Sequence, residues 1–163
     1  MKFGKQEGLG RCCAQAVWPL LREDLLEVDV DLVVPIPLHP FRLLWRGYNQ
    51  AERIARPLAG LLDRPCREAL RRRKSTRPQA RLGRRLRREN LDSGFEVRKG
   101  VSVEGRKILL VDDVVTTGAT LRAAAAALTA GGSDHVLALA IARTPESPRQ
   151  PAQSGNKVPR GLV

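Results

Sequence analysis

The sequence predicts a single α/β domain: a mostly parallel sheet flanked by helices. Three observations predict it. A β-branched apolar run lies within residues 30–37, a run of branched apolar residues lies within 106–113, and a third apolar run occupies 135–143. Helical spacing of apolar residues follows each of the first two runs, and strands that alternate with helices are typical of parallel sheets. The length of 163 residues is enough to bury one core.

The first half of the chain predicts two helices around a strand. Residues 9–26 carry apolar side chains at near-helical spacing, and we expect Pro19 to break or kink this helix. The strand at 30–37 ends in two prolines and enters a rigid loop. Asn49 is the predicted N-cap of the next helix, in which Pro57 should introduce a kink. Its apolar stripe consists of Ala51, Ile54, Ala55, Leu58, Leu61 and Leu62.

The second half predicts three further strands and one helix. Residues 66–73 read as a strand that leads into a basic loop, and 93–100 as a short strand or hairpin piece. The strand at 106–113 precedes an alanine-rich helix at 120–130, which two glycines end. The run at 135–143 is apolar on both faces, so we expect it in the middle of the sheet.

Three regions follow from this pattern. Residues 1–29 form an N-terminal helical segment and residues 30–144 form the core. From 145 to 163 the chain is rich in Pro, Ser, Gln and Gly, which predicts a disordered tail. No apolar run approaches the roughly 20 residues of a membrane span, and the first residues do not resemble a signal peptide, so we expect a cytoplasmic protein. The three cysteines form no CxxC pair that would indicate a thiolate metal site.

The formal net charge of +12 is concentrated in one segment. Residues 64–88 contain twelve Lys or Arg residues and a single acidic residue, Glu68. Such a block indicates an anionic partner, such as a phosphate, pyrophosphate or nucleic acid, or else a solvated segment. An arginine-rich compositional bias of the genome is the alternative explanation.

The stretch ILLVDDVVTTGAT, residues 108–120, carries the most chemistry. Asp112 and Asp113 end a predicted strand at the carboxyl edge of the sheet, where ligands of such sheets bind. Carboxylates there suit the hydroxyls of a ribose or a divalent cation. The following loop, which opens a helix, offers free backbone N–H groups to a phosphate, and Gly118 allows a close approach. Together these features indicate a phosphorylated ribose, unless the polar residues serve only as caps and turn formers.

This stretch resembles the PRPP-binding signature of type I phosphoribosyltransferases: four apolar residues, two acidic residues, two spacers and T-T-G-x-T. The chain contains neither GxGxxG nor GxxxxGK[ST]. The resemblance implies that Asp112 and Asp113 are the catalytic pair and hold the ribose hydroxyls. It also implies Mg²⁺ that arrives with PRPP, without direct ligation by the protein. The residues expected to bind the 5-phosphate are Thr116, Thr117, Gly118, Ala119 and Thr120.

Two other stretches, residues 34–59 and 75–97, resemble ComF-type proteins, the competence-associated branch of the same superfamily. ComF proteins commonly begin with a zinc-binding segment containing CxxC pairs, which this sequence lacks. In this fold the loop after the first strand usually meets pyrophosphate, which implies roles for Pro35, Ile36, Pro37, Leu38 and Arg46. The basic segment would be the flexible loop that closes over the ligand, through Thr76, Arg77, Gln79 and Arg81.

The expected activity is transfer of phosphoribose to, or from, a nitrogen nucleophile with loss of pyrophosphate, a step in nucleotide metabolism whose acceptor the sequence does not reveal. The alternative is a non-catalytic PRPP or nucleotide sensor, or a DNA-binding protein of competence, with nucleic acid on segment 64–88. A weaker alternative is a partner-binding subunit of the competence machinery. A homodimer is also among the expected assemblies. The presence of an acceptor pocket would separate an enzyme from a sensor.

Overall fold

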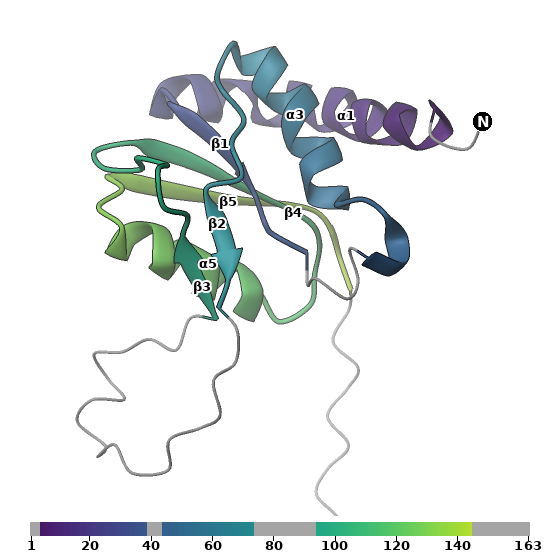
Figure 1. Ribbon diagram of the computed structural model, residues 1–163. Coiled ribbons are helices and arrows are strands. Elements are labelled where there is room, and N and C mark those ends of the chain that lie inside the picture. Colours follow the sequence, from purple (N-terminus) through teal and green to yellow (C-terminus); the bar gives the residue numbers. More distant parts are fainter. Residues whose placement is uncertain (1–3, 39–43, 74–93, 145–163) are drawn as a thin grey trace, which may run out of the picture.

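A parallel sheet with helices on both faces forms the core of the chain (Figure 1). The computed structural model describes residues 4–38, 44–73 and 94–144. Its elements, in chain order, are α1 (Gly4–Val28), β1 (Leu32–Pro35), α3 (Gln50–Leu62), β2 (Leu70–Arg72), β3 (Phe95–Val97), β4 (Lys107–Val115), α5 (Ala119–Ala130) and β5 (His135–Arg143). The predicted α/β class with a mostly parallel sheet is therefore confirmed.

The sheet has the order β1-β4-β5, and both pairings are parallel. β4 is the central strand, and its residues from Ile108 to Val111 are fully buried. The expectation that residues 135–143 lie in the middle of the sheet is wrong, because β5 is the strand at one end of this order. Its small and aliphatic side chains are half-buried or exposed. An apolar run that is rich in alanine is compatible with both positions.

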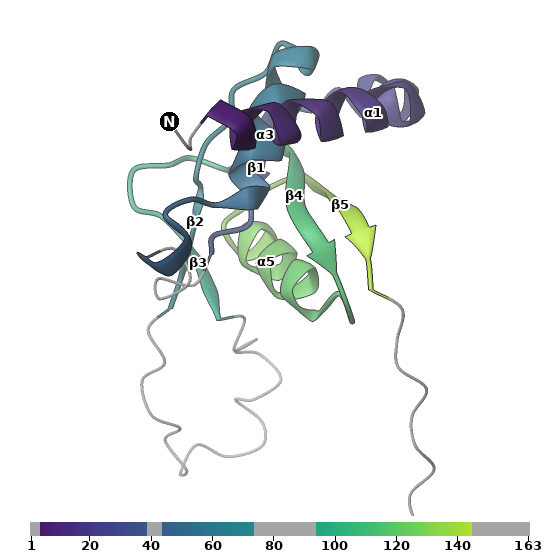
Figure 2. The same cartoon turned by 90° about the vertical axis from the view of Figure 1, so that its right-hand side faces the viewer.

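The helices cover the two faces of the sheet unequally. α1 and α3 pack on one face and α5 packs on the other (Figure 2). Successive residues of β4 alternate between these layers, since Leu109 and Val111 belong to the cluster under α1 and α3, whereas Ile108 and Leu110 belong to the cluster with α5. A short antiparallel pair, β2 with β3, adds to the α5 side of the core through the buried Phe95.

Both helices that contain an internal proline remain single elements. The sequence predicts a break or a kink at Pro19; α1 runs through Pro19 without a break, and α3 runs through Pro57. Pro19 is exposed, so water can satisfy the carbonyl that loses its backbone partner. On α3, Leu61 is 40% exposed and Ala59 is buried in its place, which corrects the predicted stripe. None of the helices in the described ranges is both long and apolar enough to cross a bilayer.

Candidate functional site

The two adjacent carboxylates lie inside the paired part of β4. The sequence predicts that the strand ends at Asp113, but β4 continues to Val115, with Asp112 opposite Ala140 of β5. The N–H of Thr144 also donates to the Val115 carbonyl at 2.9 Å. The pairing on the β5 side therefore fixes the backbone beneath both carboxylates, which still lie near the carboxyl end of the sheet.

Strand alternation directs the two carboxylates toward different layers. Asp112 lines a small cavity of about 30 Å³ together with Thr116 and Gly118, next to the start of α5. Asp113 lines a second cavity of about 260 Å³ on the side of α1 and α3, mostly between aliphatic side chains such as Leu9, Ile54, Val114 and Ile141. A ligand centred on the carboxylates can therefore reach a polar loop on one side and an apolar cavity on the other.

Asp112 has an unusual titration. Burial, and after it the hydrogen bond with the Asp113 carboxyl, raises the pKa of Asp112 to about 6. One oxygen of Asp112 also accepts a hydrogen bond from the Asp113 N–H at 2.9 Å, and the guanidinium of Arg72 favours the ionised form. A carboxylate that is costly to ionise gains from a ligand that supplies hydroxyl donors or positive charge.

Arg72 is a site residue that the sequence does not single out. Its Nε donates to the carbonyl of Pro37 at 3.1 Å, and its guanidinium lies over the ring of Phe95 at 4.7 Å. It therefore connects the loop after β1 with the carboxylate of Asp112. In the sequence it is one of many arginines in a basic block. Only the position of β2 beside this loop distinguishes it.

The loop before α5 combines a glycine cap with short, mostly polar side chains. Gly118 is the N-cap of α5 and adopts a left-handed conformation, with φ of 73°. Thr117 Oγ1 accepts from the Ala119 N–H at 3.3 Å, so one N–H of the first turn is already bonded. The side chains of Thr116, Thr117, Ala119 and Thr120 are exposed. The remaining N–H groups and the helix dipole favour an anion there.

Arg122 adds a cation to this loop that sequence reasoning missed. A Cβ added to Gly118 would lie only 3.0 Å from Arg122 Nη1, so the guanidinium folds back over the loop. The backbone N–H of Arg122 donates to the Gly118 carbonyl at 3.0 Å, one helical turn earlier. The signal in the sequence was the spacing of four residues from the glycine, which places both on one side of a helix.

The loop after β1 is pinned against the same edge. Pro35 and Ile36 are buried, whereas Pro37 and Leu38 are half-buried. The Ile36 N–H donates to the Val111 carbonyl at 2.8 Å, and Asn49 Nδ2 donates to the Ile36 carbonyl at 2.9 Å.

Asn49 also confirms its predicted role as the N-cap of α3, because its side chain accepts from the Ala51 N–H. Arg46 is exposed, and nothing in its surroundings tests the predicted contact with pyrophosphate. Thr76, Arg77, Gln79 and Arg81 lie outside the described residues, as does the predicted tail from 145 onward. Of the basic segment, only the part up to Arg73 is described.

The carboxylates do not form a complete metal cage. Nowhere in residues 4–38, 44–73 and 94–144 do three or more His, Cys, Asp or Glu side chains gather at one point. Mg²⁺ prefers octahedral oxygen coordination and is often held by one or two carboxylates together with substrate phosphates. Asp112 and Asp113 fit that second pattern, in which most of the ligands come from a bound molecule and water.

Residues 46–157 match the family model described as the phosphoribosyl transferase domain. Among curated proteins, the chain is 32% identical over 147 residues to "Competence protein F" of Haemophilus influenzae, covering 87% of this chain and 64% of that protein. It is 37% identical over 117 residues to "DNA utilization protein YhgH" of Escherichia coli, covering 70% and 50%. "Competence protein ComFC" of Streptococcus pneumoniae is 34% identical over 125 residues, covering 76% and 53%. The chain thus spans about half to two thirds of the length of these relatives.

Solved structures share the fold at lower identity. A glutamine phosphoribosylpyrophosphate (PRPP) amidotransferase from B. subtilis superposes with a TM-score of 0.55 and 21% identity, covering 83% of this chain and 26% of that one. A purine phosphoribosyltransferase from Pyrococcus horikoshii superposes with a TM-score of 0.51 and 16% identity, covering 86% and 78%. These likenesses show the fold of the core and nothing finer.

Proposed function

The chain belongs to the phosphoribosyl transferase domain family, in its ComF branch, and from this premise we propose that it binds PRPP at the carboxyl edge of β4. The observation that carries the proposal is that Asp112 shares one cavity with the Gly118 loop at the start of α5, and that Asp113 follows Asp112 directly on β4. A diol site next to a phosphate site matches the two ends of a ribose 5-phosphate group.

In this proposal each part of the edge has its own task. The carboxylates accept hydrogen bonds from the ribose 2′ and 3′ hydroxyls. The loop at 116–120, which we call the phosphate loop, binds the 5-phosphate through backbone N–H groups, with Arg122 as an added positive charge. Arg72 and the loop at 35–38 lie on the other side of Asp112, where the pyrophosphate group would extend. Mg²⁺ bound to PRPP would supply positive charge that neutralises the departing pyrophosphate.

We propose transfer of phosphoribose as the reaction. The bond between ribose C1 and the pyrophosphate oxygen breaks, the pyrophosphate leaves with that electron pair, and a nitrogen of the acceptor forms the new bond to C1 and then loses a proton. The chain contributes mainly by holding both groups and by stabilising charge on the leaving group. The apolar cavity beside Asp113 is the proposed place of the acceptor, because it adjoins the carboxylates opposite the phosphate loop.

Calorimetry with PRPP, with and without Mg²⁺, tests this proposal. We expect binding that strengthens with Mg²⁺ and weakens at least about 100-fold in Asp112→Asn/Asp113→Asn, a loss of about 2.7 kcal/mol. Glu104→Gln/Asp134→Asn is the matched control, since it removes the same charge from two exposed carboxylates outside the site. Equal binding by the site variant and by the control would disprove the proposed site.

A non-catalytic PRPP or nucleotide sensor in DNA uptake is the second candidate. The names of the relatives, which refer to competence and DNA utilization, favour it. A sensor would bind PRPP without releasing pyrophosphate in the presence of any nucleobase. Incubation with PRPP, Mg²⁺ and a panel of bases, followed by measurement of pyrophosphate, separates the two candidates once binding is established. Nucleic-acid binding by segment 64–88 and a homodimer stay predictions.

A further inference from the structure

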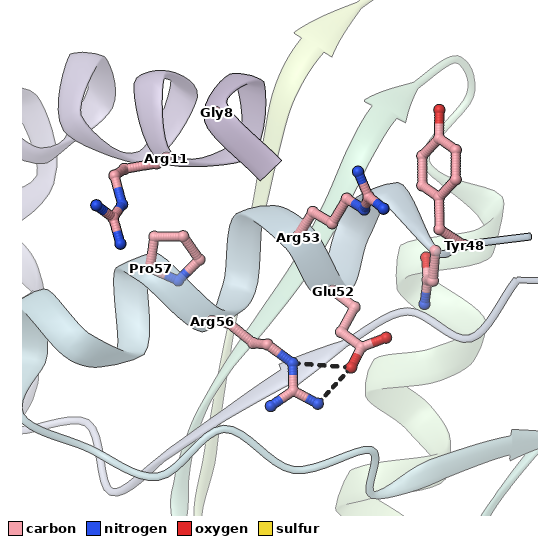
Figure 3. A pocket seen from close by; sticks show the side chains of 8 residues that line it. Gly8, Arg11, Tyr48, Glu52, Arg53, Arg56 and Pro57 are labelled. Atoms are coloured by element: carbon pink, nitrogen blue, oxygen red, sulfur yellow. Dashed lines mark hydrogen bonds and ion pairs between the residues drawn. The ribbon is translucent and has the colours of Figure 1, made fainter. Parts of the chain in front are cut away.

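A large groove lies between α1 and α3 (Figure 3). Its volume is about 580 Å³, which falls within the range of small-molecule sites. We call it the arginine groove and define it by its lining residues: Gly8, Arg11, Tyr48, Asn49, Glu52, Arg53, Arg56 and Pro57. It shares none of these residues with the cavity at the start of α5.

A close contact between the two helices builds this groove. A Cβ added to Gly10 would lie 2.3 Å from the carbonyl oxygen of Arg53, so only a glycine lets α1 rest on the backbone of α3 at this point. Arg11, the next residue of α1, is thereby placed on the same groove as Arg53 and Arg56. In Figure 3, Arg11 reaches from α1 toward Pro57, while Arg53 and Arg56 extend from α3.

The lining is unbalanced in charge. It carries three guanidinium groups and one carboxylate, which leaves a formal charge of +2. Arg56 is the arginine that pairs with this carboxylate, since its Nε donates to Glu52 Oε1 at 2.9 Å. Among residues 8–38, 44–73 and 94–144, no acidic side chain forms an ion pair with Arg11 or Arg53. The groove therefore has room for an anion beside two arginines that none of these residues neutralises.

Arg53 gives the most specific indication. Its guanidinium lies 4.0 Å from the centroid of the Tyr48 ring, which holds the group in place. Its Nη1 is buried, yet it has no hydrogen-bond partner among the described residues. A buried donor without an acceptor costs free energy, and an oxyanion that accepted a hydrogen bond from it would offset that cost. Arginine is well suited to this, because its planar fork matches phosphate oxygens.

We propose that the arginine groove is a second anion-binding site, which takes the phosphate group of a nucleotide-sized ligand. Arg53 and Arg11 supply the donors, and Arg56 contributes from its pair with Glu52. Tyr48 and Arg53 also line the apolar cavity beside Asp113, so a ligand in the groove lies next to the proposed phosphoribose site without occupying it. The proposal goes beyond PRPP binding and does not depend on it.

Nuclear magnetic resonance can read the two sites separately in the full chain. AMP is the probe, and the side-chain Nε–Hε signals of Arg53 and Arg56 report on the groove. The test variant is Arg11→Gln/Arg53→Gln, with Arg56 as the remaining reporter. The control is Arg22→Gln/Arg67→Gln, which removes the same charge from two exposed arginines. Arg22 lies roughly 16 Å further along α1 than Arg11.

We expect saturable shifts of both reporters in the wild-type protein, at least about tenfold weaker binding at Arg56 in the test variant, and binding within about twofold of wild type in the control. Unmoved reporters at millimolar AMP, or an equal loss in the control, would overturn the proposal. A thymidine octanucleotide that shifts the groove signals where AMP does not would overturn the assignment to a nucleotide-sized ligand. Ribose 5-phosphate, read at the amides of Thr116 to Gly118, tests the phosphoribose site independently.

Discussion

The phosphate loop and the arginine groove would both bind an anion, the loop through backbone N–H groups and the groove through arginine side chains. The loop offers backbone N–H groups of one short segment around a cavity of about 30 Å³. The groove offers side chains of two helices, with Arg11 and Arg56 separated by 45 positions, around about 580 Å³. A backbone site depends on one local conformation, whereas a side-chain site depends on how two helices pack. Substitutions should therefore damage the two sites separately.

Gly10→Ala should have the largest effect on stability and should break the groove, together with the adjoining cavity beside Asp113, while sparing the loop at 116–120. The new Cβ would overlap the backbone of Arg53, which cannot yield, so α1 must move away from α3. We expect a loss of about 3 kcal/mol in the free energy of unfolding. Urea unfolding followed by circular dichroism measures it, and AMP shifts at Arg53 should weaken as well. Gly8→Ala is the control, because no atom lies within 4 Å of its added Cβ; a similar loss there would contradict the packing argument.

Gly118→Val should break the loop and spare the groove. A β-branched residue strongly disfavours the left-handed conformation with φ of 73°. We expect about 100-fold weaker binding of ribose 5-phosphate, equivalent to about 2.7 kcal/mol, with AMP shifts in the groove unchanged. Titrations of the same sample measure both. Gly60→Val, at an exposed position of α3, should leave loop binding intact. If Gly118→Val retains full affinity, the phosphate does not bind at this loop.

Asn49→Ala should weaken the link between the groove and the loop after β1. The variant loses the N-cap of α3 and the hydrogen bond to the Ile36 carbonyl. We expect a loss of about 1.5 kcal/mol in the free energy of unfolding. Asn49→Asp keeps the cap acceptor and removes the donor, so its stability should fall between the other two. A denaturant series on all three proteins checks this order, and equal stability of Asn49→Asp and Asn49→Ala would show that the cap contributes nothing.

Asp112→Asn should give the smallest effect, and it should raise the free energy of unfolding where the other substitutions lower stability or binding. The pKa of Asp112 is raised to about 6 from an ordinary value of 3.8, so ionisation destabilises the folded state as pH rises through this interval. Above pH 6 the free energy of unfolding of the variant should exceed that of the wild type by about 1 kcal/mol. The difference is this small because partial solvation of Asp112 reduces the cost of its ionisation. The difference should fade as pH falls toward 4. Unfolding curves at several pH values test it; a constant difference would exclude titration of Asp112 as the cause.

The phosphate loop could be predicted from the sequence, whereas the arginine groove could not. The loop and the two carboxylates occupy thirteen consecutive residues, so their proximity was given by the chain itself. Asn49 was predicted as a cap because capping is also local. Arg72 and Arg122 were missed, although Arg122 lies only four residues from Gly118, because a basic side chain in an arginine-rich chain carries little information of its own.

The groove could not be predicted at all. It depends on the contact of Gly10 with the backbone of Arg53, and no local pattern marks that glycine. The prediction that residues 135–143 lie in the middle of the sheet was wrong for a related reason. An apolar run does not specify how many neighbouring strands its own strand has. The helix does not break at Pro19, because the cost of an internal proline depends on whether water reaches the helix at that point.

The end position of β5 has a practical consequence for work with the protein. Along nine residues the strand contains no charged residue between His135 and Arg143, and within the described ranges its sheet neighbour is β4. Backbone groups on the outer side of such a strand can pair with the same strand of another molecule. Concentrated samples should accordingly tend toward self-association through β5, so that dilute stocks and prompt measurement suit this protein better than long storage at high concentration.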